Sequence, residues 1–95
     1  MIKAIWNGFV IAESDQTKLV EGNHYFPPKA IKREYFLPSK SHTVCAWKGV
    51  ASYFDIQVEG KVNREAAWYY PQPNEAAKHI QNYVAFWRGV EITEG

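Results

Sequence analysis

Cys45 and Lys48 are the two residues of this chain whose types and spacing most directly suggest chemistry. If a turn or a bulge brings the lysine ammonium close to the sulfur, it favours the thiolate, which is the nucleophilic form of cysteine. His42, just upstream, would then complete a pair of base and nucleophile. Residues three apart on a strand point to opposite faces, so the pair requires Gly49 or the preceding loop to break the alternation. The alternative is that Cys45 is an inert, small hydrophobic side chain, which is the commonest role of a single cysteine.

Glu21 and Lys48 form a second candidate combination, either as a buried ion pair or as an acid–base pair in a cleft. Lys48 would anchor an anionic group of a ligand, and Glu21 would accept a proton or a hydrogen bond. Four aromatic side chains would form the walls of this pocket: Tyr25, Tyr53, Trp68 and Tyr70. The alternative is that the two charged residues form an exposed ion pair, which contributes little stability, and that the rings belong to the core.

Neither a metal nor a cofactor is expected from this sequence. The soft metal ligands available are His24, His42, Cys45 and His79. Structural zinc sites use paired Cys-x-x-Cys motifs, and this chain has a single cysteine. A site made from these four side chains would need ligands from four distant elements.

A short basic cluster formed by Lys29, Lys32 and Arg33 follows two prolines. It would attract a phosphate or a carboxylate if it lined a site, whereas the commoner role of such a cluster is a solvated turn. Nucleic-acid binding needs a basic stripe interleaved with aromatic residues. The net charge of only +1 does not favour such a stripe, and we expect no nucleic-acid partner.

The chain has 95 residues, which fits a single domain that spans residues 1–95. A domain this short buries only about 60–65% of its unfolded surface, so its core must be dense. Four Trp, six Tyr and five Phe can supply that core, and surplus rings tend to line pockets or interfaces. One cysteine excludes an intramolecular disulfide, Asn7-Gly8 interrupts the first apolar run, and no apolar segment approaches the length of a membrane span. We therefore expect a cytoplasmic protein with no membrane contact.

Turn residues divide the chain into many short apolar segments. Asn7-Gly8 is the strongest hairpin signal, and Gly22-Asn23 and Glu59-Gly60-Lys61 predict further turns. The segments between these signals alternate in polarity, which is typical of strands. Strands are predicted over residues 2–6, 9–12, 17–21, 24–26, 35–37, 43–46, 50–58, 62–70, 83–87 and 90–93.

The remaining segments are loops or short helices. Residues 38–41 are predicted as a loop, and residues 28–34 allow one helical turn that begins at a proline. Asn74 as the N-cap and Asn82 as a left-handed C-cap predict a helix over about 74–81. The fold class is therefore mainly β with one short helix (α+β), as a single compact, curved antiparallel sheet or a small open barrel.

Four stretches of the chain together match the pattern of a known family. They are Glu21 with Tyr25-Phe26-Pro27; Cys45 with Lys48-Gly49, Ala51 and Tyr53; Ala67-Trp68 with Tyr70, Pro71 and Pro73; and Val84-Ala85-Phe86 after the helix. In order and spacing they resemble the small bacterial proteins known as domain of unknown function 427, over nearly the whole chain. The family often has proline and tyrosine where this chain has Ala46 and Trp47, and often glycine where this chain has Asn82.

The resemblance implies a compact β-rich domain of the β-tent kind. A nucleotidyltransferase label accompanies the family, but the residues of this chain do not support that activity. Nucleotidyl transfer needs carboxylates placed together to hold Mg²⁺ against the phosphates. Here the acidic residues are scattered singly, and the chain has no Gly-Lys-Ser/Thr phosphate loop.

These observations favour a small-molecule site made from Glu21, Tyr25, Cys45, Lys48 and Trp68, and they leave open whether the protein is an enzyme. The alternative function is a non-catalytic interaction or assembly module, in which surplus aromatic rings form a partner surface. A cleft containing both Lys48 and Glu21 would favour the first function. A flat apolar patch, with both residues exposed on opposite sides, would favour the second. Open sheet edges are compatible with a homodimer as well as with a monomer.

Overall fold

Nine strands and three short 3₁₀ helices form the chain in the computed structural model, which describes residues 1–95. The strands are β1 (Ile2–Trp6), β2 (Phe9–Ser14), β3 (Lys18–Val20), β4 (Asn23–Tyr25), β5 (Phe36–Cys45), β6 (Gly49–Val58), β7 (Lys61–Tyr69), β8 (Val84–Phe86) and β9 (Glu91–Glu94). The 3₁₀ helices are η1 (Pro28–Ala30), η2 (Arg33–Tyr35) and η3 (Glu75–Ile80). The predicted mainly β fold with one longer helical segment near the C-terminus is confirmed.

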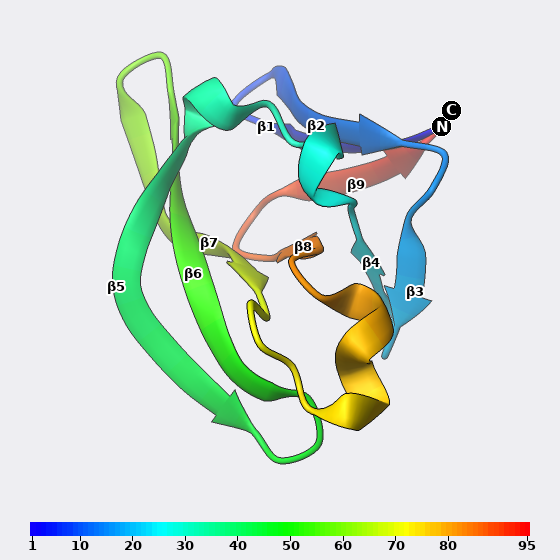
Figure 1. The fold of residues 1–95 in the computed structure, drawn as a ribbon. Helices are drawn as coiled ribbons and strands as arrows, with labels where there is room; N and C mark the ends of the chain where they lie inside the picture. Colours follow the sequence, from blue (N-terminus) through cyan, green and yellow to red (C-terminus); the bar gives the residue numbers. More distant parts are fainter.

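The strands pair in three antiparallel sheets, ordered β2-β1-β9, β3-β4 and β5-β6-β7-β8 (Figure 1). They are thus divided among three sheets and do not form the one continuous sheet that the turn pattern predicted. Phe26 forms a single bridge to Val84, which joins β4 to the edge of the large sheet. The pairing cannot continue because Pro27 and Pro28 follow and lack the N–H groups that a ladder needs.

Two-residue turns close three hairpins and also bend the connection from β8 to β9, two strands of different sheets. Each has a non-glycine residue followed by glycine, both with positive φ, which is the backbone that matches the twist of antiparallel strands. The four turns are Asn7-Gly8, Glu21-Gly22, Glu59-Gly60 and Arg88-Gly89. The turn predicted at Gly22-Asn23 therefore lies one residue earlier, and Glu21 is part of it.

β5 runs without interruption through residues 38–41, where a loop was predicted. Pro38 is tolerated because β5 is an edge strand of its sheet, so the missing N–H removes no bond to a second neighbour. The ladder between β5 and β6 shifts register between Pro38 and His42, which accommodates the irregular segment. β5 and β6 curve along one side of the molecule (Figure 1).

η3 replaces the helix predicted over about 74–81. It is a 3₁₀ segment interrupted at Ala77, which has φ −115°. Asn82 follows it with φ 63°, which confirms the predicted left-handed residue. The side chain of Asn74 makes no cap hydrogen bond, so the prediction of a side-chain N-cap is wrong. In Figure 1 this segment lies beside β3 and β4, and Lys18 Nζ donates to the His79 carbonyl at 2.6 Å.

Two hydrophobic cores lie on opposite faces of the large sheet. The first core contains Ala4, Ile11, Ala12, Phe26, Ile31, Phe36, Phe54, Ile56, Val58, Ala66, Ala67, Val84 and Phe86. The second core contains Tyr25, Ala51, Tyr53, Tyr70, Ala77, Ile80 and Ala85. Tyr53 and Phe54 of β6 belong to different cores, as do Ala85 and Phe86 of β8, because successive side chains of a strand point to opposite faces. The large sheet is therefore covered on both sides, and any pocket must form beside one core or the other.

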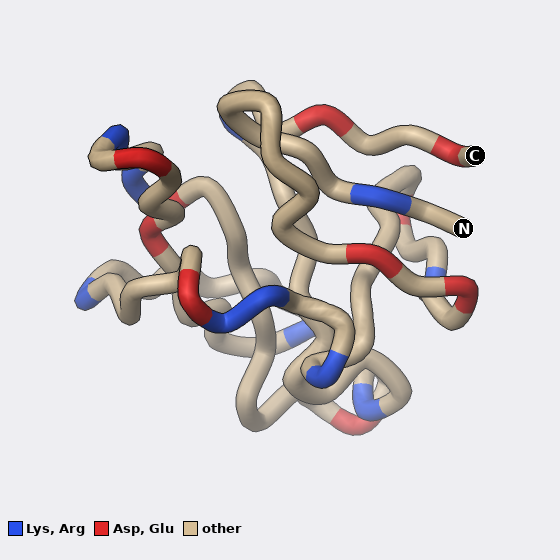
Figure 2. The backbone as a smooth tube through the Cα atoms, turned by 90° about the horizontal axis from the view of Figure 1, so that it is seen from above, with Lys and Arg blue, Asp and Glu red and all other residues tan.

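Basic and acidic residues are interspersed along the backbone, and neither sign occupies a face of its own (Figure 2). The two ends of the chain lie side by side, where the Gly95 N–H donates to the Met1 carbonyl at 3.1 Å (Figures 1 and 2). Among the helical segments, none has the length and apolar character needed to cross a membrane.

Candidate functional site

Lys48 is the only buried charged residue of the molecule, with 6% of its surface exposed. It lies in the three-residue loop 46–48 between β5 and β6, and the flanking residues Cys45 and Gly49 form the last pair of that hairpin. Burying a charge costs free energy unless the charge is paired and hydrogen-bonded. The groups around Lys48 must therefore compensate the cost of burying its ammonium.

Asn74 fixes the loop that carries Lys48. Its backbone N–H donates to the Lys48 carbonyl at 2.9 Å, and its side chain donates to the carbonyls of Ala46 and Trp47 at 3.4 and 3.3 Å. Gly49 has φ 112°, and a Cβ there would lie 3.3 Å from the Asn74 nitrogen. Glycine is thus needed both for the backbone conformation and for the close approach of Asn74.

Glu21 is the ionic partner of Lys48. Its Oε1 accepts a hydrogen bond from Lys48 Nζ, and its Oε2 accepts one from Trp47 Nε1 at 3.3 Å. Glu21 has φ 53°, a conformation that costs free energy in a non-glycine residue. Its side chain is 54% exposed, so the carboxylate reaches Lys48 and solvent at the same time. The structure brings these two predicted residues together.

The ion pair changes the acidity of its members. Hydrogen bonds from Lys48 and Trp47 hold the pKa of the Glu21 carboxyl below its ordinary value of 4.5. Burial acts to lower the pKa of Lys48, but the Glu21 hydrogen bond and the Tyr25 and Tyr70 phenol groups outweigh it, so the pKa lies above 10.5. Burial raises the pKa of Tyr70 to about 12, although Lys48 opposes this. At neutral pH the site holds an ammonium, a carboxylate and a neutral Tyr70 phenol.

A pocket of about 160 Å³ opens beside Lys48. Its lining residues are Lys48, Tyr53, Trp68, Tyr70 and Trp87. Trp68 and Trp87 meet edge to face with ring centroids 5.7 Å apart, and Lys48 Nζ lies 5.6 Å from the centre of the Tyr70 ring. The second distance is within the range of a cation–π interaction. The pocket is therefore a small aromatic chamber with one buried ammonium in its wall.

Strand register places the aromatic walls. Tyr53 of β6 pairs directly with Trp68 of β7, and Tyr70 lies on the same face because it is two residues further along. The Tyr53 hydroxyl is held by Thr43 Oγ1 at 2.8 Å. Tyr25, which was predicted as a wall, is fully buried behind Trp68 and accepts a hydrogen bond from its Nε1 at 3.1 Å. Tyr25 thus orients the indole and is not one of the lining residues.

Cys45 lies at the end of β5, half-buried against the second core. No hydrogen bond joins its thiol to Lys48, whose ammonium is bonded to Glu21. His42 Nδ1 is 3.3 Å from the Ser52 hydroxyl and is likewise not bonded to the thiol. The structure therefore places Cys45 beside the site without the base or the ammonium contact that an activated nucleophile would use.

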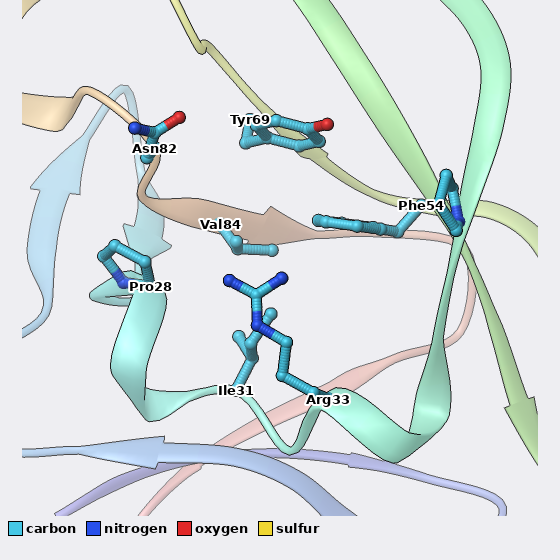
Figure 3. A pocket seen from close by; sticks show the side chains of 8 residues that line it. Pro28, Ile31, Arg33, Phe54, Tyr69, Asn82 and Val84 are labelled. Atoms are coloured by element: carbon cyan, nitrogen blue, oxygen red, sulfur yellow. The ribbon is translucent and has the colours of Figure 1, made fainter.

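Trp87 is a lining residue that was not predicted from the sequence. It follows β8, where Ala85 pairs with Trp68 across the ladder. Alternation along the segment places Trp87 on the same face as Ala85, so the signal was present in the spacing. It could be used only once β8 was known to pair with β7, which is a long-range contact. A second, larger cavity was not predicted either, but Arg33 of the predicted basic cluster lines it, whereas Lys29 and Lys32 do not (Figure 3).

The histidines take part in separate local contacts. His24 Nδ1 is 2.9 Å from the Thr17 hydroxyl, across the β3–β4 hairpin. The molecule contains no group of three or more His, Cys, Asp or Glu side chains that could hold a metal ion.

Comparison with known proteins identifies the family. No curated protein matches the chain. A family model described as Domain of unknown function (DUF427) matches residues 1–94, which include all four stretches on which the resemblance was based. Because the match covers nearly the whole chain, this protein belongs to the DUF427 family.

Proposed function

We propose that the pocket beside Lys48 binds a small planar molecule that carries an anionic or carbonyl oxygen next to a hydrogen-bond donor. The observation that carries this proposal is the buried ammonium of Lys48 in an otherwise aromatic chamber. A lysine ammonium has three N–H donors, and Lys48 uses one of them on Glu21. The others are available to a ligand oxygen, and the burial of Lys48 strengthens that contact.

The aromatic walls favour a flat ligand. Trp68, Trp87 and Tyr53 present large apolar surfaces whose shapes are fixed by packing and by hydrogen bonds. A planar ring can stack on such surfaces, whereas a puckered ring makes less contact. The volume of about 160 Å³ suits a single ring with one or two small substituents.

Glu21 gives the site its second polar contact. Its carboxylate is half exposed, and each of its oxygens can accept more than one hydrogen bond. A ligand N–H or O–H can therefore donate to Glu21 while an adjacent oxygen accepts from Lys48. This arrangement selects a neighbouring acceptor and donor on one edge of the ring. Glu21 is not one of the lining residues of the pocket, and its link to the site is the hydrogen bond that it accepts from Lys48.

Cys45 has a supporting role in this proposal, as part of the packing beside Tyr53 and Tyr70. A covalent reaction would need the thiolate close to the ligand and a group to favour it. Neither Lys48 nor His42 is bonded to the thiol. The proposed function is therefore reversible binding, and an enzymatic role for Cys45 would have to appear as fast alkylation that depends on Lys48.

Titration calorimetry with anthranilate tests the proposal, because this molecule has a flat ring, a carboxylate and an adjacent amino donor. We expect a dissociation constant on the order of 0.1–1 mM, which is about −4 to −5.5 kcal/mol. Lys48→Met should weaken binding by about tenfold or more, since it removes the charged donor. Lys61→Met is the matched control, because Lys61 is exposed at the start of β7 and its replacement should leave binding unchanged.

Two further probes separate charge from shape. Aniline lacks the carboxylate and cyclohexanecarboxylate lacks the flat ring, so both should bind more weakly than anthranilate. Equal binding of anthranilate to wild type and Lys48→Met, with the folded state intact by circular dichroism, would exclude Lys48 as the anchor.

A further inference from the structure

A cavity of about 460 Å³ lies on the face of the large sheet opposite the Lys48 pocket. Its lining residues are Pro28, Ile31, Arg33, Pro38, Phe54, Tyr69, Asn82 and Val84 (Figure 3). Alternation separates the two sites: Tyr53 and Trp68 line the Lys48 pocket, whereas their chain neighbours Phe54 and Tyr69 line this cavity. The cavity is therefore a distinct site, and its volume is within the range of pockets that bind organic ligands.

Arg33 supplies the cation of this cavity. Figure 3 shows its guanidinium pointing toward the middle of the lining residues, above Ile31 and beside Val84. The guanidinium takes part in none of the ion pairs or side-chain hydrogen bonds of the molecule, so all five N–H donors are free of protein partners. Lys32 precedes Arg33, and Lys29 lies on the same short segment, but neither lysine lines the cavity.

Phe54 and Tyr69 form an aromatic side of the cavity. Their rings stack on each other with centroids 4.7 Å apart and planes inclined by only 21°, so the pair presents the outer face of a ring and ring edges to a ligand. Ile31 and Val84 are buried at 6% and 2% exposure and add an apolar floor. Tyr69 and Asn82 also line the cavity, so their hydroxyl and amide groups are two polar groups that ring substituents could contact.

We infer that this cavity binds a planar organic oxyanion, with its carboxylate or phosphate group held by Arg33 and its ring system against Phe54 and Tyr69. A guanidinium presents parallel N–H groups that match the two oxygens of a carboxylate or phosphate. The cavity is larger than the Lys48 pocket, about 460 against 160 Å³, so the ring system it accommodates is larger than one ring. The site stands independently of the function proposed for Lys48.

Calorimetric titration with 2-naphthoate tests this site. Arg33→Met should weaken 2-naphthoate binding by about tenfold or more. Arg33→Lys should give an intermediate loss of affinity, because lysine keeps the positive charge but lacks the parallel N–H groups of a guanidinium. Lys32→Met is the matched control, since it makes the same change in net charge at the neighbouring residue and should leave the affinity within about twofold. The guanidinium makes no ion pair with the protein, so thermal melts should show Arg33→Met to be as stable as wild type.

Three further arms complete the test. The neutral analogue 2-naphthamide should bind at least about tenfold more weakly than 2-naphthoate if the oxyanion is the anchor. 2-Naphthyl phosphate, titrated in parallel, shows whether the Arg33 guanidinium binds a phosphate or a carboxylate more tightly. Lys48→Met should leave 2-naphthoate binding within about twofold, because Lys48 belongs to the other pocket.

Several results would overturn the inference. Absence of 2-naphthoate binding to wild type would do so directly, as would equal affinities of wild type and Arg33→Met. An equal loss of 2-naphthoate affinity in Arg33→Met and Lys32→Met would mean that the ligand responds only to the net positive charge of the segment and not to a specific contact with Arg33. Loss of 2-naphthoate binding in Lys48→Met alone would assign the ligand to the Lys48 pocket, while leaving the function proposed for that pocket intact.

Discussion

At the scale of single residues, the Glu21–Lys48 pair accounts for most of the unusual features of this chain. A buried ammonium and a strained glutamate would each destabilise the fold alone, and they meet in one contact. The pKa of Glu21 is depressed, so its contribution to stability is present above pH 4.5 and is lost as pH falls through the lower folded value. The pKa of Lys48 is raised, so its contribution is present below pH 10.5 and is lost at higher pH.

Glu21→Gln should therefore reduce the free energy of unfolding at neutral pH, because it leaves the Lys48 ammonium with a weaker, uncharged partner. The difference from wild type should shrink as pH falls below 4.5, because the unfolded state then gains a proton, and it should be smallest below the lower folded pKa of Glu21, where the native wild-type carboxyl is also neutral. Urea denaturation at a series of pH values measures this difference.

Glu59→Gln is the control for that series, because Glu59 occupies the corresponding turn position with φ 51° and forms no ion pair. Glu59→Gln should change the free energy of unfolding only slightly at every pH. A difference between wild type and Glu21→Gln that stays constant down to acid pH would show that the Glu21 charge does not stabilise the fold.

Cys45 gives a second test at this scale. Because no hydrogen bond joins the thiol to Lys48, we expect Lys48→Met to change the rate of Cys45 alkylation by no more than about twofold at any pH. The measurement is the rate of reaction with iodoacetamide in the folded protein. A large slowing in Lys48→Met would favour an activated nucleophile and hence an enzyme.

The sequence predicted much of the Lys48 site. For the Arg33 site it predicted only that the basic cluster Lys29, Lys32 and Arg33 would attract a phosphate or a carboxylate if it lined a site. Glu21 and Lys48 could be found because a single cysteine and the motifs around it direct attention to them. Trp87 and the lining role of Arg33 depend on the pairing of β8 with β7 and on the bridge from Phe26 to Val84, which join distant parts of the chain. Local patterns of polarity do not specify such pairings.

At the scale of elements, the loop between β5 and β6 and the segment before η3 act as one unit. Asn74 bonds three consecutive residues of the loop, and the positive φ of Gly49 makes this approach feasible. The direction of Lys48 into the pocket thus depends on contact between two elements, and the loop sequence alone does not determine it.

Gly49→Ala should lower the free energy of unfolding by about 1–3 kcal/mol, because it adds backbone strain and crowds Asn74. Gly60→Ala is the matched control: Gly60 has φ 78° with open space around it, so only the strain, about 1 kcal/mol, should appear. Urea denaturation of both variants separates crowding from strain, and equal losses would show that the Asn74 contact is not tight.

Local sequence predicted the elements best where glycine decides the backbone. The turns at Asn7-Gly8 and Glu59-Gly60 were found because the residues themselves favour that conformation. β5 was divided by a false loop because the sequence does not show that Pro38 lies on an edge strand. Asn74 was taken for a cap because its bonding to the loop 46–48 is a tertiary contact.

At the scale of the whole molecule, the two cores share the strands of one sheet. Tyr25 belongs to the second core and Phe26 to the first, so two adjacent residues connect both cores to the edge of β8. A substitution that weakens the packing of one core should therefore also destabilise the other core. We expect the chain to unfold as one cooperative unit.

Phe26→Leu should lower the free energy of unfolding by about 1–2 kcal/mol, because it removes part of a fully buried ring that contacts Phe86. Phe9→Leu, at a 38% exposed position, should cost less than about 1 kcal/mol. Tryptophan fluorescence and far-ultraviolet circular dichroism should report the same midpoint for each variant. Separate midpoints in Phe26→Leu would mean that the two cores unfold independently.

The indole N–H signals of the four tryptophans test the central claim most directly. In ¹H–¹⁵N spectra recorded during an anthranilate titration, the signals of Trp68 and Trp87 should shift and saturate together, because both rings line the Lys48 pocket. The signal of Trp6, which packs against the first core, should not shift. The shifts should disappear in Lys48→Met. Shifts confined to Trp6, or shifts of Trp68 and Trp87 that persist unchanged in Lys48→Met, would contradict a binding site anchored by Lys48.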